Sequence, residues 1–138
     1  MTRHRAASMH DEGERIVKYL ILMHVDPEIL ESLTAEQQQA IGAGHEAFMA
    51  KTTETGEMLS THALGAPSQS KVVRSRNGRP ETVDGPFAET KEFMGGYYLV
   101  DVDSEERAIE LAKEIPDASI DGLALEIRPV MFSAGADI

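Results

Sequence analysis

His45 and Asp84 have the chemistry of an acid–base pair in this 138-residue chain. Histidine changes charge close to neutral pH, and a neighbouring carboxylate fixes the tautomer of its ring, as a general base requires. His45 lies beside Ile41 and Phe48 at helical spacing. A lone histidine on such a face is more often a hydrogen-bonded core residue, and Asp84 equally suits a turn. Both interpretations stay open.

Asp84 opens a run of residues that could line a small polar pocket. Pro86 fixes the backbone φ angle there, and Phe87 either walls the pocket or fills the core. Glu89 and Lys91 follow as a possible acid–base group and a possible anion contact, although both also suit a solvated surface. We predict His45 and Asp84 as catalytic and Pro86, Phe87, Glu89 and Lys91 as ligand-binding.

Three histidines, His24, His45 and His62, are enough in number for a zinc or iron site. No two of them have ligand spacing within one element, such as His-x₃-His. The chain has no cysteine, and it has no glycine-rich phosphate loop or nucleophile elbow. We therefore predict no metal and no cofactor, and keep the three-histidine site as the alternative.

The formal net charge of −11 argues against general nucleic-acid binding, which depends on neutralising phosphates. The basic cluster Lys71, Arg74, Arg76 and Arg79 stands out in this acidic chain and suits either a solvated hairpin or an anion site. No apolar run approaches the roughly 18 residues that a membrane span needs. The first 15 residues lack the apolar region of a signal peptide, so we expect a cytoplasmic protein without membrane contact.

Hydrophobic spacing and turn residues predict an α+β fold. We expect a mobile tail over residues 1–15, one domain over 16–132 and a frayed end over 133–138. Without the hairpin, the element order is β-α-β-β-α-β, the ferredoxin-like pattern of an antiparallel sheet with two helices on one face. The predicted elements are strands Val17–His24, Met58–Leu64, Tyr97–Val102 and Leu123–Arg128, helices at Ala35–Thr55 and after Asp103, and a hairpin around Asn77-Gly78.

The first strand is apolar on both faces, because Tyr19 and Ile21 alternate with Leu20 and Leu22. A strand of this kind is covered on both faces. The helices cover one face, and a second subunit is the economical cover for the other. We therefore predict a homodimer.

Three motifs carry a family resemblance: Asp84-Gly-Pro-Phe-Ala-Glu-Thr-Lys-Glu, Gly95-Gly-Tyr-Tyr and Asp101-Val-Asp-Ser. They resemble the signature of the DGPF family within the YCII-related superfamily, whose members are similar to dimeric α+β barrels. The resemblance implies a functional histidine eleven residues before the glycine that ends the first long helix, as His45 stands before Gly56. It also implies a partner aspartate near the end of the second helix. Ile115 stands just before Pro116 here, so we take Asp84 as the substitute carboxylate.

The resemblance implies a homodimer that binds a small organic molecule. In an isomerase- or lyase-like step, His45 would be the base, Asp84 would orient it and Lys91 would stabilise negative charge. The alternative is a non-catalytic accessory or sensor domain linked to an extracytoplasmic-function sigma factor. That partner would contact either the basic hairpin or the acidic run Asp101–Glu106. A third interpretation is a purely structural dimer.

Overall fold

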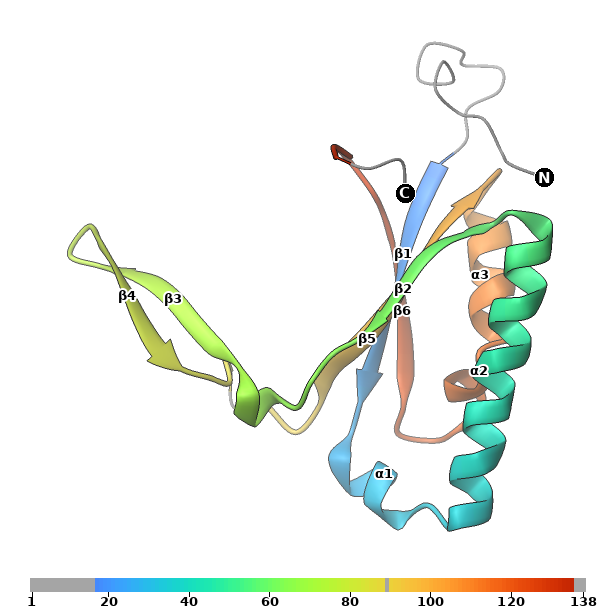
Figure 1. Cartoon of the computed structure of the whole chain (residues 1–138), viewed down its shortest axis with the longest axis horizontal. Coiled ribbons are helices and arrows are strands. Elements are labelled where there is room, and N and C mark those ends of the chain that lie inside the picture. The colour runs from blue at the N-terminus through green and yellow to red at the C-terminus, as the bar shows by residue number, and fades with distance from the viewer. Residues whose placement is uncertain (1–16, 89, 136–138) are drawn as a thin grey trace.

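The computed structural model describes residues 17–88 and 90–135. The expected tail over 1–15, the last three residues of the expected frayed end, and Glu89 lie outside this part of the chain. The main elements are four strands in one sheet, a two-stranded hairpin, and two helices of more than two turns (Figure 1). A short helix, α1 (Pro27–Ser32), precedes the first long one.

The long helix α2 (Ala35–Thr55) begins and ends where its sequence predicts. The Thr34 hydroxyl accepts a hydrogen bond from the amide of Gln37 at 3.0 Å, and the Gln37 side chain accepts one from the Thr34 amide at 2.8 Å. This capping box satisfies two amides that the helix leaves without internal partners. At the other end, Gly56 has φ 79°, a left-handed conformation that glycine adopts without steric cost.

The sheet is antiparallel with strand order β2-β5-β1-β6, formed by β1 (Val17–Val25), β2 (Met58–Ala63), β5 (Phe93–Val102) and β6 (Ala124–Pro129). Without the hairpin this is the ferredoxin-like arrangement, so the fold-class prediction is confirmed. Helices α2 and α3 (Glu105–Lys113) lie on the same side of the sheet (Figure 1). No described helix is long and apolar enough to cross a membrane.

The core fills the space between the sheet and these two helices. Ala108, Leu111 and Ala112 on α3 are buried, and they meet inward-facing side chains of the two central strands. The fully enclosed side chains include Ile21, Tyr98, Val100, Val102, Leu111 and Ile115. Tyr98 is the only one of these six that has a polar atom, so its hydroxyl requires a partner.

The opposite face of the sheet, which we call the open face, carries apolar side chains at its centre. Leu20 lies opposite Leu99, and Leu22 lies opposite Tyr97, in the pairing of β1 with β5. No described helix covers this face, as Figure 1 shows with the sheet nearly edge-on. The two-sided apolar pattern of β1 is therefore a real feature of the folded chain.

The hairpin consists of β3 (Lys71–Arg76) and β4 (Arg79–Asp84), which pair only with each other. Asn77 and Gly78 have φ values of 52° and 78°, the two left-handed positions of the expected type I′ turn. Figure 1 shows the hairpin leaving the end of the sheet and extending away from α2 and α3, toward the side of the open face.

Candidate functional site

His45 forms hydrogen bonds through both ring nitrogens. Its Nδ1 lies 2.7 Å from the Tyr98 hydroxyl, and its Nε2 lies 3.0 Å from Oδ1 of Asp117. An ionised carboxylate only accepts hydrogen bonds, so Nε2 carries the proton in the neutral ring. Nδ1 is then the basic atom, and it accepts the hydrogen bond that the Tyr98 hydroxyl donates. We call these three residues the His45 cluster.

Tyr98 enters the cluster from β5, where alternation turns its side chain toward the helices. It is only 2% exposed, and its ring meets Phe48 edge-on at 4.9 Å between centroids. Burial, followed by the negative charge of Asp117, raises the pKa of Tyr98 to about 12. The hydroxyl therefore stays protonated at neutral pH and remains a donor to His45.

Asp117 enters from the short 3₁₀ turn η4 (Pro116–Ser119) that follows α3. Pro116 ends the helix, because proline has no amide hydrogen to continue it. Gly44 lets α2 approach this turn closely: a Cβ built on Gly44 would lie 2.4 Å from Cγ of Pro116. The close contact of Gly44 with Pro116 sets the distance across which His45 reaches Asp117.

This geometry corrects the expectation that the chain lacks the aspartate near the end of the second helix. That expectation rested on Ile115, which stands before Pro116 and is buried in the core. The carboxylate stands on the other side of the proline, at Asp117, and is within hydrogen-bonding distance of His45. A substitute carboxylate is therefore unnecessary to fix the tautomer of His45.

The predicted residues of the DGPF run do not gather around His45 within one chain. Asp84 ends β4, where its carboxylate lies 2.5 Å from Nζ of Lys71, and its side chain is 85% exposed. Pro86 follows Asp84 in the same loop, and Phe87 is 78% exposed, so it neither fills the core nor walls a pocket in this chain. Glu89 lies outside the described residues.

Lys91 lies 3.5 Å from the buried carboxylate of Asp26, which also accepts a hydrogen bond from the amide of Glu28. Lys91 thus ties the segment between the hairpin and β5 to the start of α1. In this chain it neutralises a protein carboxylate and does not face His45.

Asp117 differs from two other buried carboxylates, Glu57 and Asp26, in the kind of partner it has. Glu57 receives two hydrogen bonds from the guanidinium of Arg107, at 2.7 and 2.9 Å, and these raise the pKa of Arg107 above its usual range. Asp26 has Lys91. Those partners are a guanidinium and an ammonium group, whereas the partner of Asp117 is an imidazole whose other nitrogen contacts Tyr98.

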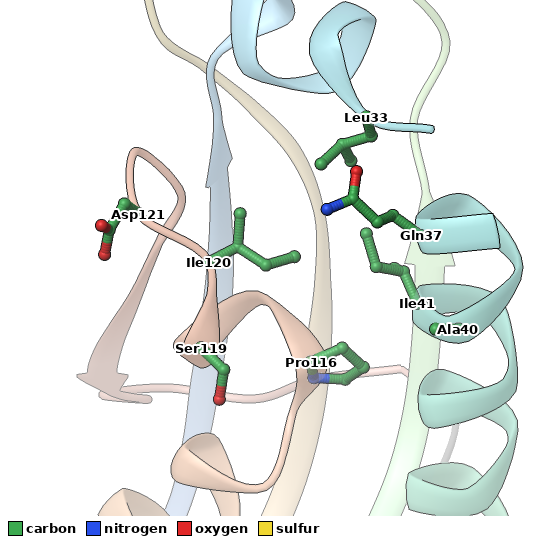
Figure 2. Close-up of a pocket in the computed structure, with 8 residues that line it drawn as sticks. All are labelled: Leu33, Gln37, Ala40, Ile41, Pro116, Ser119, Ile120 and Asp121. Carbon is green, nitrogen blue, oxygen red and sulfur yellow. The ribbon is translucent and has the colours of Figure 1, made fainter. Parts of the chain in front are cut away.

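An open pocket of about 510 Å³ lies beside the His45 cluster, between α1, α2 and η4 (Figure 2). Ile41 and Pro116 line it; Ile41 is one helical turn before His45, and Pro116 directly precedes Asp117. Most of its surface is apolar. The lining residues are Leu33, Gln37, Ala40, Ile41, Pro116, Ser119, Ile120 and Asp121.

The structure separates the three histidines that were considered as metal ligands. His24 bonds Glu126 at 2.8 Å and His62 bonds the Tyr97 hydroxyl at 2.9 Å, both on the open face of the sheet. His45 lies on the helix side. Within residues 17–88 and 90–135, no group of three or more histidine, cysteine, aspartate or glutamate side chains could hold a metal ion.

Comparison with known proteins places this chain in a family. The model of the YCII-related domain matches residues 17–131, which is most of the chain. The protein belongs to the YCII-related family. It is also 28% identical over 112 residues to the uncharacterized protein R00369 of Rhizobium meliloti (strain 1021), an alignment that covers 81% of this chain and 90% of that protein. The family therefore defines the fold and leaves the activity open.

Two members of the His45 cluster were missed from the sequence, although each left a signal. Tyr98 is a single tyrosine in an inward-facing row with Val100 and Val102, and a buried hydroxyl requires a partner. Asp117 is an acidic residue directly after the proline that ends α3. A search for a carboxylate on both sides of Pro116 would have found it.

Proposed function

We propose that this YCII-related protein binds a small organic molecule in the pocket between α1, α2 and η4. One observation carries the proposal: the two elements that line most of the pocket, α2 and η4, also hold His45 and Asp117. A ligand in the pocket would therefore lie one helical turn from a titratable group with a fixed tautomer. A mostly apolar concave surface with a few polar groups is typical of small-molecule sites.

The polar groups of the lining favour a ligand with a carbonyl or carboxylate oxygen. The oxygen of the Gln37 side chain is occupied by the Thr34 amide, which leaves the amide nitrogen as a donor. Figure 2 shows that nitrogen pointing into the space between α2 and Ile120. Ser119 lies on the opposite wall. The apolar remainder suits a compact hydrocarbon or aromatic body.

Acid–base chemistry is the second element of the proposal. Asp117 would hold His45 with Nε2 protonated, and Nδ1 would accept a proton in an isomerase- or lyase-like step. Tyr98 occupies Nδ1, so proton transfer from a ligand to His45 would run through its hydroxyl. Asp117 takes the orienting role that the sequence assigned to Asp84.

The binding proposal can be tested with substitutions on one helix. Ala40→Trp would fill the pocket, whereas Ala43→Trp places the same side chain on an exposed position of α2 outside the lining. Amide NMR spectra would be recorded with a panel of monocyclic aromatic carboxylates and aldehydes. We expect some of these compounds to shift Ile41 and Ser119 in the wild type and in Ala43→Trp, with loss of the shifts in Ala40→Trp.

A panel that leaves Ile41 and Ser119 unchanged in the wild type would contradict ligand binding. The same spectra separate binding from chemistry. Ligands that also shift the ring nitrogens of His45 support the acid–base role. Ligands that bind without affecting that ring would remove the acid–base role and leave the binding site in place.

We further propose that the protein is a cytoplasmic homodimer, a DGPF member of the dimeric α+β barrels, with the open faces of two sheets packed together. The apolar row of Leu20, Leu22 and Leu99 on the uncovered face supports this arrangement. In such a dimer the DGPF run, including Asp84 and Lys91, would approach the partner's surface. Leu99→Glu would place a charge in that interface, and sedimentation equilibrium would then detect a monomer.

The second candidate is an accessory or sensor domain for an extracytoplasmic-function sigma factor. The exposed aromatic ring of Phe87 beside a basic hairpin favours it, because aromatic and arginine side chains are enriched at protein interfaces. Co-purification of a sigma factor that survives His45→Ala and disappears in the charge-reversed hairpin would support it. Co-purification that is independent of the hairpin would contradict that contact.

A further inference from the structure

The two faces of the β3–β4 hairpin differ in composition. Directly opposite residues of an antiparallel pair share a face. Val72 opposes Val83, Arg74 opposes Glu81, and Arg76 opposes Arg79, so these six side chains lie on one face. We call this the arginine face. The other face carries Lys71, Val73, Ser75, Pro80, Thr82 and Asp84.

Phe87 extends the arginine face. The guanidinium carbon of Arg74 lies 5.8 Å from the centre of the Phe87 ring, a cation–π distance, and the ring is otherwise exposed. Arg79 has no carboxylate within ion-pair distance among the described residues, and the contact of Arg76 with Glu81 is 3.9 Å long. The exposed apolar side chains of Val83 and Phe87 therefore lie beside weakly neutralised cations, as in protein interfaces, whereas Val72 is buried within its own chain.

The position of the hairpin limits what can cover this face. A two-stranded hairpin is marginally stable by itself in water, and this one has no strand partner in the sheet. It extends away from the body of its own chain, toward the side of the open face (Figure 1). A second molecule seated on the open face would therefore lie beside the hairpin.

Charge favours a second copy of this chain as that molecule. Residues 71–84 carry four basic and two acidic side chains, a formal +2, so a chain of net −11 carries −13 outside the hairpin. Opposite charges steer association and fix its orientation. The part of a second copy outside its hairpin is therefore negatively charged, opposite in sign to the hairpin.

We infer that the arginine face of the β3–β4 hairpin binds the acidic surface of a second copy of this chain. We call this contact the clasp. The open-face homodimer proposed above is a premise of this inference. The clasp adds a second, electrostatic contact at the end of the sheet. It also assigns Phe87 a role as an apolar anchor between the chains.

A matched pair of substitutions tests the clasp. Arg74→Glu and Lys71→Glu reverse one charge each, and each places like charges opposite one another, at Glu81 and at Asp84. Only Arg74 lies on the arginine face. Sedimentation equilibrium of the full chain at low and high salt would give the dissociation constant of the dimer for the wild type and both variants.

We expect Arg74→Glu to raise the dissociation constant about tenfold at low salt and less at high salt, with Lys71→Glu close to wild type. Phe87→Ala should weaken the dimer at both salt concentrations.

A wild type that stays monomeric contradicts both the homodimer and the clasp. A dimer weakened equally by Arg74→Glu and Lys71→Glu, or by neither, overturns the clasp alone. If Arg74→Glu loses another co-purifying protein while the dissociation constant of the dimer stays unchanged, the arginine face binds that protein. This result also overturns the clasp.

Discussion

The His45 cluster and the arginine face of the hairpin are opposite exceptions to ordinary burial. In the first, the polar side chains of Tyr98 and Asp117 are buried, and each forms a hydrogen bond with His45. In the second, the apolar side chains of Val83 and Phe87 are exposed beside arginines. Buried polar groups and exposed apolar groups are the informative departures in a folded chain.

The comparison separates two kinds of evidence for function. The His45 cluster is complete within one chain, so its role in stability and in a ligand site can be tested on a monomer. The arginine face is incomplete within one chain, so its role can be measured only when another molecule covers it. Substitutions in the cluster should therefore change folding, and substitutions in the hairpin should change association.

The largest expected contrast is between two aromatic truncations. Tyr98→Ala removes an enclosed ring and should lower the free energy of unfolding by about 3–5 kcal/mol. Phe87→Ala removes an exposed ring and should change it by less than about 0.5 kcal/mol at concentrations where the chain is monomeric. Urea unfolding followed by circular dichroism measures both. Equal losses would mean that the hairpin is part of the folded core.

Two aspartates give the next contrast. Asp117→Ala leaves the Nε2–H group of His45 without its acceptor and should cost about 1–3 kcal/mol of unfolding free energy. Asp84→Ala removes an exposed ion pair with Lys71 and should cost less than about 1 kcal/mol. The same urea experiment applies. A larger loss in Asp84→Ala would show that the aspartate of the DGPF run supports the fold after all.

Two glycines on α2 test how closely the helix must approach η4. Gly44→Ala would force Pro116 away and should destabilise the fold by about 1–3 kcal/mol, the usual range for overpacking. Gly42 has no atom within 4 Å of a built Cβ, so Gly42→Ala should stabilise the helix by up to about 1 kcal/mol. Opposite shifts in thermal midpoint are expected. A neutral Gly44→Ala would mean that the contact with Pro116 is dispensable.

A further expected effect is a pH dependence of stability in the alkaline range. The pKa of Tyr98 is raised from 10.0 to about 12, so the folded state holds a proton that the unfolded state loses first. The stabilisation is complete below pH 10 and is lost as the pH rises toward 12. Burial, and then the charge of Glu105, also raise the pKa of Tyr19, so the wild type alone is ambiguous. Tyr98→Phe should show a shallower decline of stability between pH 10 and 12, whereas an unchanged slope would contradict the assignment to Tyr98.

The fold could be predicted because its signals are local. The capping box at Thr34, the turn at Asn77-Gly78 and the alternation along β1 each specify an element from a few neighbouring residues. The site could be predicted only in part, because its members lie far apart in sequence. His45 was found from its helix, but the contact with Asp117 spans 72 residues and depends on how closely α2 meets η4.

The conspicuous DGPF run lies apart from His45 within one chain. Asp84, Phe87 and Lys91 are dense in chemical groups, yet in one chain they form a hairpin end and a tie to Asp26. Nothing in their spacing indicates that the segment leaves the body of the molecule. The charge of the hairpin was visible in the sequence. The direction in which it projects is a property of the fold.

The most direct measurement is a long-range ¹H–¹⁵N NMR spectrum of the His45 ring at neutral pH, assigned with His45→Gln and repeated in Asp117→Asn and Asp84→Asn. The arrangement found here predicts that the neutral form of the ring carries its proton on Nε2, with Nδ1 accepting a hydrogen bond from Tyr98. Asp117→Asn should change the ring nitrogen shifts, and Asp84→Asn should leave them unchanged. A ring protonated at Nδ1, or one that responds to Asp84 and ignores Asp117, would contradict the site described.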